Sequence, residues 1–415
     1  MRGWLPRILL VSVLLQTAVY AIRPMVSYQA LALGAGEFEL GAIASAYAVL
    51  SLALAVPIGR WVDRWGEPRF VVVGSAVIAL VALWLVWVDS VVALAASQAA
   101  LGMGHIMTVV GAQALIANRG DPLRRDTRFG LFTVVVSLGQ LAGPAVGGLV
   151  AGSGNVAGSS GPAGGAQEGL GIGFVFAVAA GTAGLATLVA VLLLLADSRR
   201  RAHSAERLEV PTGDGPGDRP SAWVAMGEVL RIPSMPHAMA ASLTVLTAID
   251  LLAVYLPAYG ATHGLSVETV GLLLATRAAA SMASRLLMLP LIRWMGRRRL
   301  LVLSIVLPAA ALALVPVLDS HALLYAAMTV IGFGLGLGQP ITLAWVADRA
   351  PDEIRGTALG VRLSGNRLGQ TVLPSAVGLV AGVSGVAGVF VSLAVLLGAS
   401  AAAVLATPFA GREPP

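Results

Sequence analysis

The sequence predicts an all-α membrane protein, with 12 transmembrane helices in two pseudo-symmetric six-helix bundles. Three observations predict this fold class: the overall hydropathy, the number of long apolar segments and an internal repeat. The chain has 415 residues, of which 57% are hydrophobic and 12% charged, and its mean hydropathy is +0.85. A soluble fold of this length is excluded by so apolar a composition.

Long apolar segments recur along the whole chain. Each has about 18 to 28 residues, enough to cross a hydrocarbon core of roughly 30 Å as a helix. Twelve spans are predicted, near residues 7–33, 40–58, 70–88, 91–117, 129–151, 170–196, 234–260, 267–291, 300–318, 321–347, 357–381 and 386–409.

The arginines indicate how the spans are oriented. Of the 27 basic residues, 22 fall on cytoplasmic segments if the amino terminus is inside, and the short outward loops contain none. The positive-inside rule therefore predicts a multi-pass protein of the bacterial cytoplasmic (inner) membrane with both termini in the cytoplasm. The net charge of +6 then reflects topology, so no nucleic acid partner is expected. The first segment also resembles a signal peptide, but cleavage would reverse the charge rule in every later loop, so a retained helix is favoured.

The two halves of the chain repeat each other at an offset of 230 residues, without gaps from about residue 34 to 152. Gly102 matches Gly332, and Pro144 matches Pro374. Six spans in each half make this a parallel repeat about an axis along the membrane normal. The predicted domains are an amino-terminal six-helix bundle, a cytoplasmic linker with a short amphipathic helix and a carboxyl-terminal six-helix bundle, at residues 1–196, 197–232 and 233–415.

The loop between the second and third spans carries a recognisable motif, "GRWVDRWGEPRF". It fits the pattern G-x-x-x-D-R-x-G-x-x-R at Gly59, Asp63, Arg64, Gly66 and Arg69. With the two halves and the short linker, this loop resembles the major facilitator superfamily, which implies the major facilitator fold. In that family the loop is a cytoplasmic latch; the carboxylate of Asp63 would lie near the amino end of the eleventh span, where the helix dipole stabilises it. Glu67 and Pro68 replace the usual basic pair, which predicts a weaker or one-sided latch.

The span near 129–151 contains a second motif. It resembles the helix-5 signature of the drug:proton antiporter branch, G-x-x-x-G-P-x-x-G-G, at Gly139, Gly143, Pro144, Gly147 and Gly148. Small residues four apart let helices approach closely in lipid, and the proline adds a bend. We expect these glycines to make a close contact between the halves, against the span near 267–291; ordinary helix packing is the alternative. The resemblance implies proton-coupled export.

Ionisable residues inside spans are costly in lipid and typically face a cavity or a partner. The spans contain six: Arg23, Asp250, Arg277, Arg285, Arg362 and Arg367. The repeat places Arg23 and Asp250 at similar depth, so we predict that they pair when the outer gate closes and that Asp250 takes up a proton when they part. A fixed structural pair is the alternative. Arg277 and Arg367 lie near mid-membrane, and arginine binds carboxylate or phosphate in a two-pronged fashion, which favours an anionic substrate.

Uncharged polar residues complete the candidate pathway. His105 lies mid-span and has the side chain that titrates nearest physiological pH, although a helix contact is the alternative role. Gln16, Gln98, Gln113, Asn366 and Gln370 are candidates for the cavity or for contacts between helices. Gln98 stands where the family's R-x-x-x-G-x-G motif has its arginine, which moves the expected proton site to Asp250.

The favoured function is secondary active transport by alternating access, with proton-coupled export of a small drug-like or anionic organic molecule. Uptake or exchange of an organic anion is the first alternative, and a non-transporting membrane sensor is a remote one. An enzyme is not expected, because the spans lack a nucleophile elbow, an HExxH motif and a carboxylate pair. No cofactor or metal is expected, and the proton gradient is the expected driving force. The expected partners are a small-molecule substrate and the lipid bilayer, with a monomer sufficient.

Overall fold

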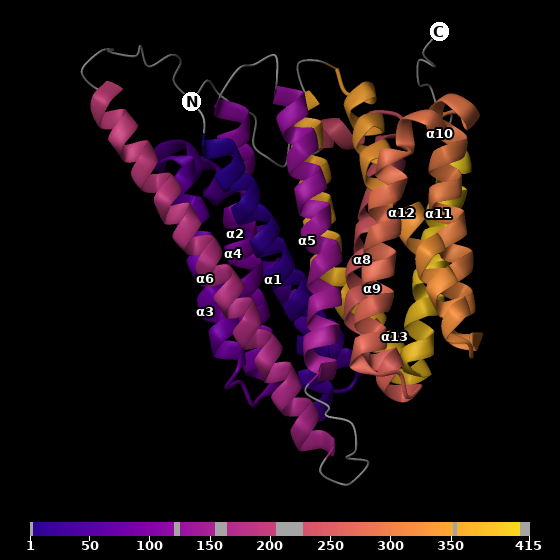
Figure 1. Ribbon diagram of the computed structural model, residues 1–415. Helices are drawn as coiled ribbons and strands as arrows, with labels where there is room; N and C mark the ends of the chain where they lie inside the picture. The colour runs from indigo at the N-terminus through magenta and orange to yellow at the C-terminus, as the bar shows by residue number, and fades with distance from the viewer. Residues whose placement is uncertain (1–2, 120–124, 154–163, 205–226, 352–354, 407–415) are drawn as a thin grey trace.

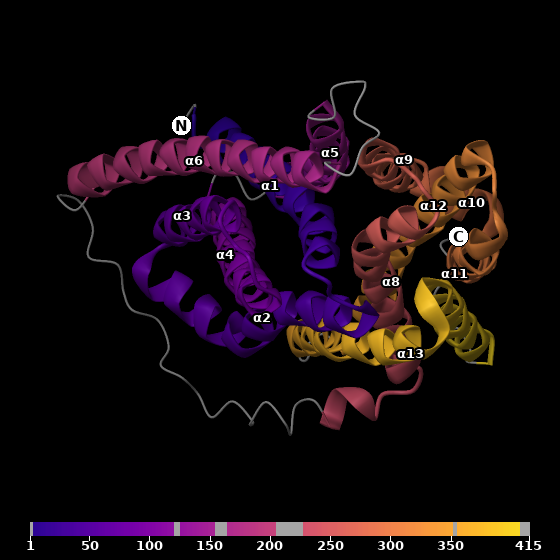
Figure 2. The same cartoon turned by 90° about the horizontal axis from the view of Figure 1, so that it is seen from below.

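A computed structural model describes residues 3–119, 125–153, 164–204, 227–351 and 355–406. In these residues the chain is helical, with short turns and no strand. The helices lie side by side along one direction (Figure 1). Viewed along that direction, α1 to α6 lie on one side of the molecule and α8 to α13 on the other (Figure 2). The exact domain boundaries stay a prediction.

The first half consists of six long helices. They are α1 (Trp4–Ala32), α2 (Glu37–Trp65), α3 (Glu67–Leu85), α4 (Val91–Asn118), α5 (Arg125–Ser153) and α6 (Gly164–Ser204). Helix α4 begins where the Ser90 hydroxyl accepts a hydrogen bond from the Ala93 amide at 3.3 Å, as an N-cap does. Helix α6 begins earlier and ends later than its predicted apolar segment, because the polar residues on either side of that segment are also helical.

The second half contains α8 (Met235–Thr262), α9 (Val267–Leu286), α10 (Met288–Met295), α11 (Arg297–Leu314), a 3-10 turn (Val315–Val317), α12 (His321–Arg349) and α13 (Arg355–Ala406). Helices α9 and α10 are bent by 61° and together make one span, where the sequence predicts one straight helix. The predicted amphipathic helix lies mostly outside the described residues; only 227–230 are seen as helical.

Twelve spans are confirmed when the bent pair α9 and α10 is counted as one span and the long helix α13 as two. Ten helices are long and apolar enough to cross a membrane, and the bent pair α9 and α10 adds one more. Helix α13 has 52 residues and would extend about 78 Å if straight, far more than a bilayer core of roughly 30 Å. It breaks at Gly385, where φ is 70°, so it supplies two spans.

The repeat is visible in backbone contacts as well as in sequence. A Cβ atom added at Gly102 would collide with the carbonyl oxygen of Tyr47, and one added at Gly332 would collide with that of Arg277. These positions are related by the offset of 230. Gly66 and Gly296 are also equivalent, and each joins two helices with φ of 89° and 81°, a conformation that only glycine adopts easily.

The two halves meet closely at one end of the molecule, which we call the closed end. It is the end at which α1, α5 and α8 finish and α2 and α9 begin. The Tyr255 hydroxyl donates to the Glu37 carbonyl at 2.7 Å, joining α8 to α2. On the other side of the molecule, a Cβ at Gly148 would lie 2.9 Å from the Gly271 Cα, so α5 and α9 touch backbone to backbone. The structure therefore has its halves packed together at this end.

The expected role of the antiporter-like glycines is wrong for most of the motif. A Cβ at Gly143 would lie 2.7 Å from Tyr20 Cβ, one at Gly139 would collide with Gln16, and one at Gly147 would lie 3.5 Å from Ala21 Cα. These contacts are with α1 of the same half. Residues four apart share one face of a helix. On the neighbouring face, Gly148 is the one motif glycine that reaches α9 of the other half, together with the carbonyl of Pro144.

The latch motif spans the junction of α2 and α3. Gly59 and Asp63 lie in the last turns of α2, but their side chains are outside the described part of the structure, so the latch stays a prediction. Arg64 is exposed, and Arg69 Nη1 donates to the Trp65 carbonyl at 3.0 Å.

The two residues that depart from the family pattern each have a local structural role at the start of α3. Glu67 accepts a hydrogen bond from Asn118 Nδ2 at 2.9 Å, so it ties the start of α3 to the end of α4. Pro68 fits the first turn of α3, where its missing N–H is not needed.

Candidate functional site

A buried ion pair joins the two halves at the centre of the molecule. Arg23 Nη1 of α1 lies 2.6 Å from Asp250 Oδ1 of α8, and the two side chains are 6% and 9% exposed. The other carboxylate oxygen of Asp250 accepts a hydrogen bond from Gln370 Nε2 of α13. Gln370 Oε1 in turn accepts from Arg367 Nη1 at 3.0 Å. A continuous chain of charge-assisted hydrogen bonds therefore runs from α1 through α8 to α13.

Aromatic residues extend this chain into the first half. The guanidinium carbon of Arg23 lies 4.7 Å from the centre of the Tyr47 ring and 5.9 Å from that of Tyr20, close enough for cation–π attraction. The Tyr47 hydroxyl is 2.5 Å from His105 Nδ1. His105 of α4 is thus connected, through Tyr47 of α2, to the ion pair between the halves.

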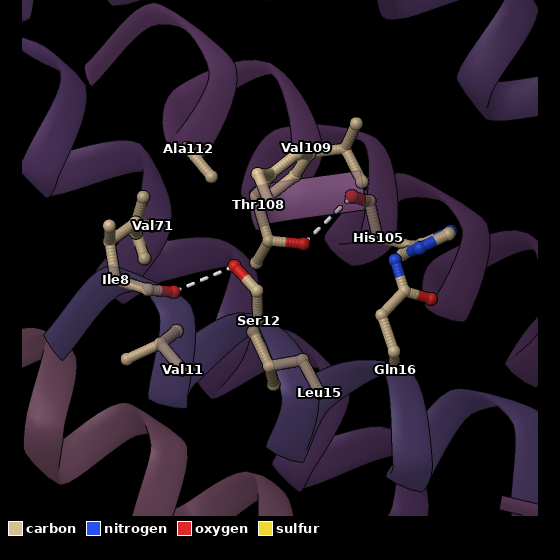
Figure 3. Close-up of a pocket in the computed structure, with 11 residues that line it drawn as sticks. Ile8, Val11, Ser12, Leu15, Gln16, Val71, His105, Thr108, Val109 and Ala112 are labelled. Atoms are coloured by element: carbon tan, nitrogen blue, oxygen red, sulfur yellow. Dashed lines mark hydrogen bonds between the residues drawn. The ribbon is translucent and has the colours of Figure 1, made fainter. Parts of the chain in front are cut away.

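A small cavity, lined mainly by apolar side chains, lies beside His105. It holds about 10 Å³ and is bordered by α1, α3, α4 and α5 (Figure 3). Both His105 and Gln16 border it, and the buried atoms His105 Nε2 and Gln16 Oε1 have no hydrogen-bond partner among the described residues. The Ser12 and Thr108 hydroxyls donate to helix carbonyls at 2.7 and 2.8 Å, which leaves their oxygens free to accept.

Four further arginines lie within the predicted spans of the second half, at 277, 285, 362 and 367, and none of these four has an acidic partner in the part of the chain that the structure describes. Arg285 Nη1 donates to the Ser137 hydroxyl at 2.9 Å, and its Nε to the Gly336 carbonyl at 3.3 Å. Arg362 Nη2 donates to Gln339 Oε1 at 2.8 Å. Arg367 donates to Gln370, as described above.

Arg277 differs from these three. It is 4% exposed, its buried Nε has no hydrogen-bond partner, and no hydrogen bond from it is seen among the described residues. Arg277 is therefore a buried cation that is not part of the central network.

The remaining predicted residues are not joined to this network. Asn366 is 3% exposed, and its Oδ1 has no hydrogen-bond partner within the described part of the chain. Gln113 is exposed and lies eight residues beyond His105, about 12 Å farther along α4. No group of three or more His, Asp or Glu side chains in the described residues is placed to hold a metal ion.

Sequence reasoning missed Tyr20, Tyr47 and Gln140 as neighbours of the charged centre. Gln140 Nε2 donates to the Tyr20 hydroxyl at 3.1 Å. The repeat contained the signal, because Tyr20, Tyr47 and Gln140 are the first-half equivalents of Asp250, Arg277 and Gln370.

The chain is similar to known membrane transporters. The sequence profile of the Major Facilitator Superfamily matches residues 8–307 and 240–415. A stretch of 130 residues, 31% of this chain, is 26% identical to an uncharacterized MFS-type transporter of Methanocaldococcus jannaschii. That match spans 34% of the relative's length, about a third of it.

Solved structures with the same architecture cover nearly the whole chain. A bacterial homolog of the human lysosomal transporter Spinster, in an inward-facing and occupied conformation, is 16% identical over 98% of this chain and 97% of its own, with a TM-score of 0.74. The nucleoside transporter NupG is 14% identical over 97% of this chain and 99% of its own, with a TM-score of 0.75. At these identities the likeness shows the fold alone.

Proposed function

Because this chain belongs to the major facilitator superfamily and is a multi-pass secondary transporter rather than an enzyme, we propose that it exports a small organic molecule by proton-coupled alternating access. The observation that carries this proposal is the buried Arg23–Asp250 pair, which joins α1 to α8 across the two halves. A titratable group at the contact between two moving bodies can link protonation to their separation.

The physical reason is electrostatic. Separating two opposite charges inside a low-dielectric protein is expensive, because each loses its partner without gaining water. Protonation of Asp250 removes one of the charges, so the halves part at lower cost when a proton is bound. Gln370 keeps a hydrogen bond to the carboxyl group in either state, which holds its side chain in place. When Arg23 and Asp250 come together again, the carboxyl group of Asp250 releases the proton.

Orientation of the chain follows from its arginines. With the positive-inside rule, the closed end faces outward and both termini lie in the cytoplasm of a bacterial inner membrane. A monomer contains both halves and both partners of the ion pair, so one chain is sufficient for the cycle. The export direction rests on the antiporter-like motif of α5, which supports the proposal less strongly than the Arg23–Asp250 pair does.

Uptake or exchange of an organic anion is the alternative. It is favoured by one observation: four arginines in the second half contact neutral acceptors or none in the described residues. Such a site repels cations, whichever direction transport takes.

Reconstitution separates these possibilities. Proteoliposomes that contain a pH-sensitive dye are exposed first to lipophilic cations and then to organic anions, with protein-free liposomes as the control. We expect substrate-triggered proton movement only when protein is present. Anion accumulation without proton movement would favour the alternative, and ligand binding without transport of any compound would contradict both.

A further inference from the structure

We infer that Arg277 and Tyr20 form a subsite that binds the anionic group of the transported substrate, a carboxylate or a phosphate. The subsite lies beside α5, which packs against α1 on one side and α9 on the other. This inference rests on the proposed transport function and goes further than it, because it assigns the substrate class to two residues and separates substrate binding from the Arg23–Asp250 coupling pair.

Arg277 is a buried donor group with no acceptor. A guanidinium has several N–H donors and no acceptor, and leaving them unpaired away from water is unfavourable. Arg277 is only 4% exposed, and no hydrogen bond from it is seen among the described residues. Its backbone cannot easily shift to release the side chain, because a Cβ at Gly332 would already lie 2.9 Å from the Arg277 Cα.

Tyr20 supplies a second donor in the same region. Its hydroxyl oxygen accepts a hydrogen bond from Gln140 Nε2 at 3.1 Å. This bond leaves the phenolic proton of Tyr20 available to a second partner. No acceptor for that proton is seen in the described residues. Helix α5 touches α9 at Gly148 and Gly271, and the two helices run in opposite directions, so Arg277, six residues beyond Gly271, lies near the level of Gln140. Two donors without an acceptor therefore lie near each other, and a ligand that offers oxygen acceptors with negative charge satisfies both.

The neighbouring carboxylate does not fill this role. Asp250 uses one oxygen for Arg23 and the other for Gln370. Its charge is thereby committed to the coupling pair, and the cation at Arg277 remains unbalanced.

The other arginines are also distinguishable from Arg277. Arg362 and Arg367 donate to glutamine oxygens, at 2.8 and 3.0 Å. Arg285 lies eight residues beyond Arg277, about 12 Å along α9, and is held by Ser137 across the halves. It provides a second cation farther along the same helix, whereas Arg277 is the one of these four for which no hydrogen bond is seen in the described residues.

The first test needs no ligand. The melting temperature of the purified full-length protein in detergent is compared for Arg277→Gln and Arg362→Gln. Removing an unbalanced buried cation is expected to raise the melting temperature of Arg277→Gln by about 2 °C. Arg362→Gln loses the bonds to Gln339 and is expected to melt lower. A lower melting temperature for Arg277→Gln would overturn the inference, because it would mean that Arg277 is already satisfied.

The second test adds probes: succinate, benzoate and inorganic phosphate as anions, and tetraphenylphosphonium as a cation. At least one anion is expected to raise the melting temperature of the wild type and of the control Arg362→Gln. That shift is expected to disappear in Arg277→Gln, to shrink in Tyr20→Phe and to be partly retained in Arg277→Lys. A shift that survives in Arg277→Gln, or a response to the cation alone, or none to any probe, would overturn the subsite.

The melting temperature in detergent does not depend on the proposed transport function, since its measurement needs no proton gradient and no membrane. Anion binding that requires Arg277, together with no proton movement in liposomes, would contradict the coupling and keep the subsite. Proton movement driven by lipophilic cations, with no anion-dependent shift, would contradict the subsite and keep the coupling.

Discussion

The two halves of the molecule have a glutamine hydrogen bond at equivalent positions of the repeat, but the acceptor is neutral in one half and charged in the other. In the first half, Gln140 donates to the neutral Tyr20 hydroxyl. In the second half, the equivalent Gln370 donates to the Asp250 carboxylate, which also binds Arg23. The backbone therefore decides where a polar contact forms, and the residue type decides whether that contact carries charge.

A second equivalent pair follows the same rule. Glycines Gly102 and Gly332 pack against the carbonyls of Tyr47 and Arg277, which are themselves equivalent. One side chain is an aromatic ring that lies under Arg23, and the other is a cation without a hydrogen-bond partner in the described residues. A symmetric scaffold thus carries charged chemistry mainly in its second half.

The largest expected effect comes from breaking the charge balance of the second-half site. Arg23→Gln leaves the Asp250 carboxylate buried without its cation, and we expect a loss of about 3–5 kcal/mol in stability at neutral pH. Thermal unfolding of the purified variant and the wild type at neutral pH measures it. The double variant Arg23→Gln/Asp250→Asn should recover most of the stability, and failure to recover would mean that Arg23 acts mainly through packing.

A smaller effect is expected from disturbing the close helix packing that both halves share. Gly332→Ala places a Cβ against the Arg277 carbonyl, so we expect overpacking to lower the stability by about 1–3 kcal/mol. The control Gly360→Ala meets open space on an exposed face and should raise stability by up to about 1 kcal/mol, because alanine favours helix. Melting temperatures of the two purified variants should therefore move in opposite directions. Shifts of the same sign would contradict the close packing of α9 on α12.

The smallest expected effect is the difference in stability cost between changes at the two equivalent glutamines. Gln370→Leu removes a hydrogen bond to a carboxylate and is expected to cost about 1.5–3 kcal/mol, whereas Gln140→Leu removes one to a phenol and should cost about 0.5–1.5 kcal/mol. Thermal unfolding of both variants under one condition gives the difference. Equal costs would indicate that Asp250 carries no charge in this conformation.

Sequence reasoning predicted the scaffold better than the contacts. Hydropathy gave the twelve spans, and the repeat placed Arg23 and Asp250 on related faces at similar depth, where the structure has them paired. It gave the wrong partner for Gly139 and Gly143, because a small-residue pattern shows that some helix approaches closely but does not show which one. Tyr47 was missed because an aromatic residue in an apolar helix looks like any core residue. Which donor meets which acceptor depends on rotamers, and these follow only from the packed structure.

One variant tests most directly whether Asp250 couples proton movement to transport. Asp250→Asn is reconstituted in proteoliposomes, and substrate exchange at equal pH is compared with accumulation driven by a pH gradient. The account predicts that exchange persists while the gradient no longer drives accumulation, and that the exposed loop variant Asp89→Asn behaves like the wild type. Gradient-driven accumulation that survives in Asp250→Asn would contradict the account.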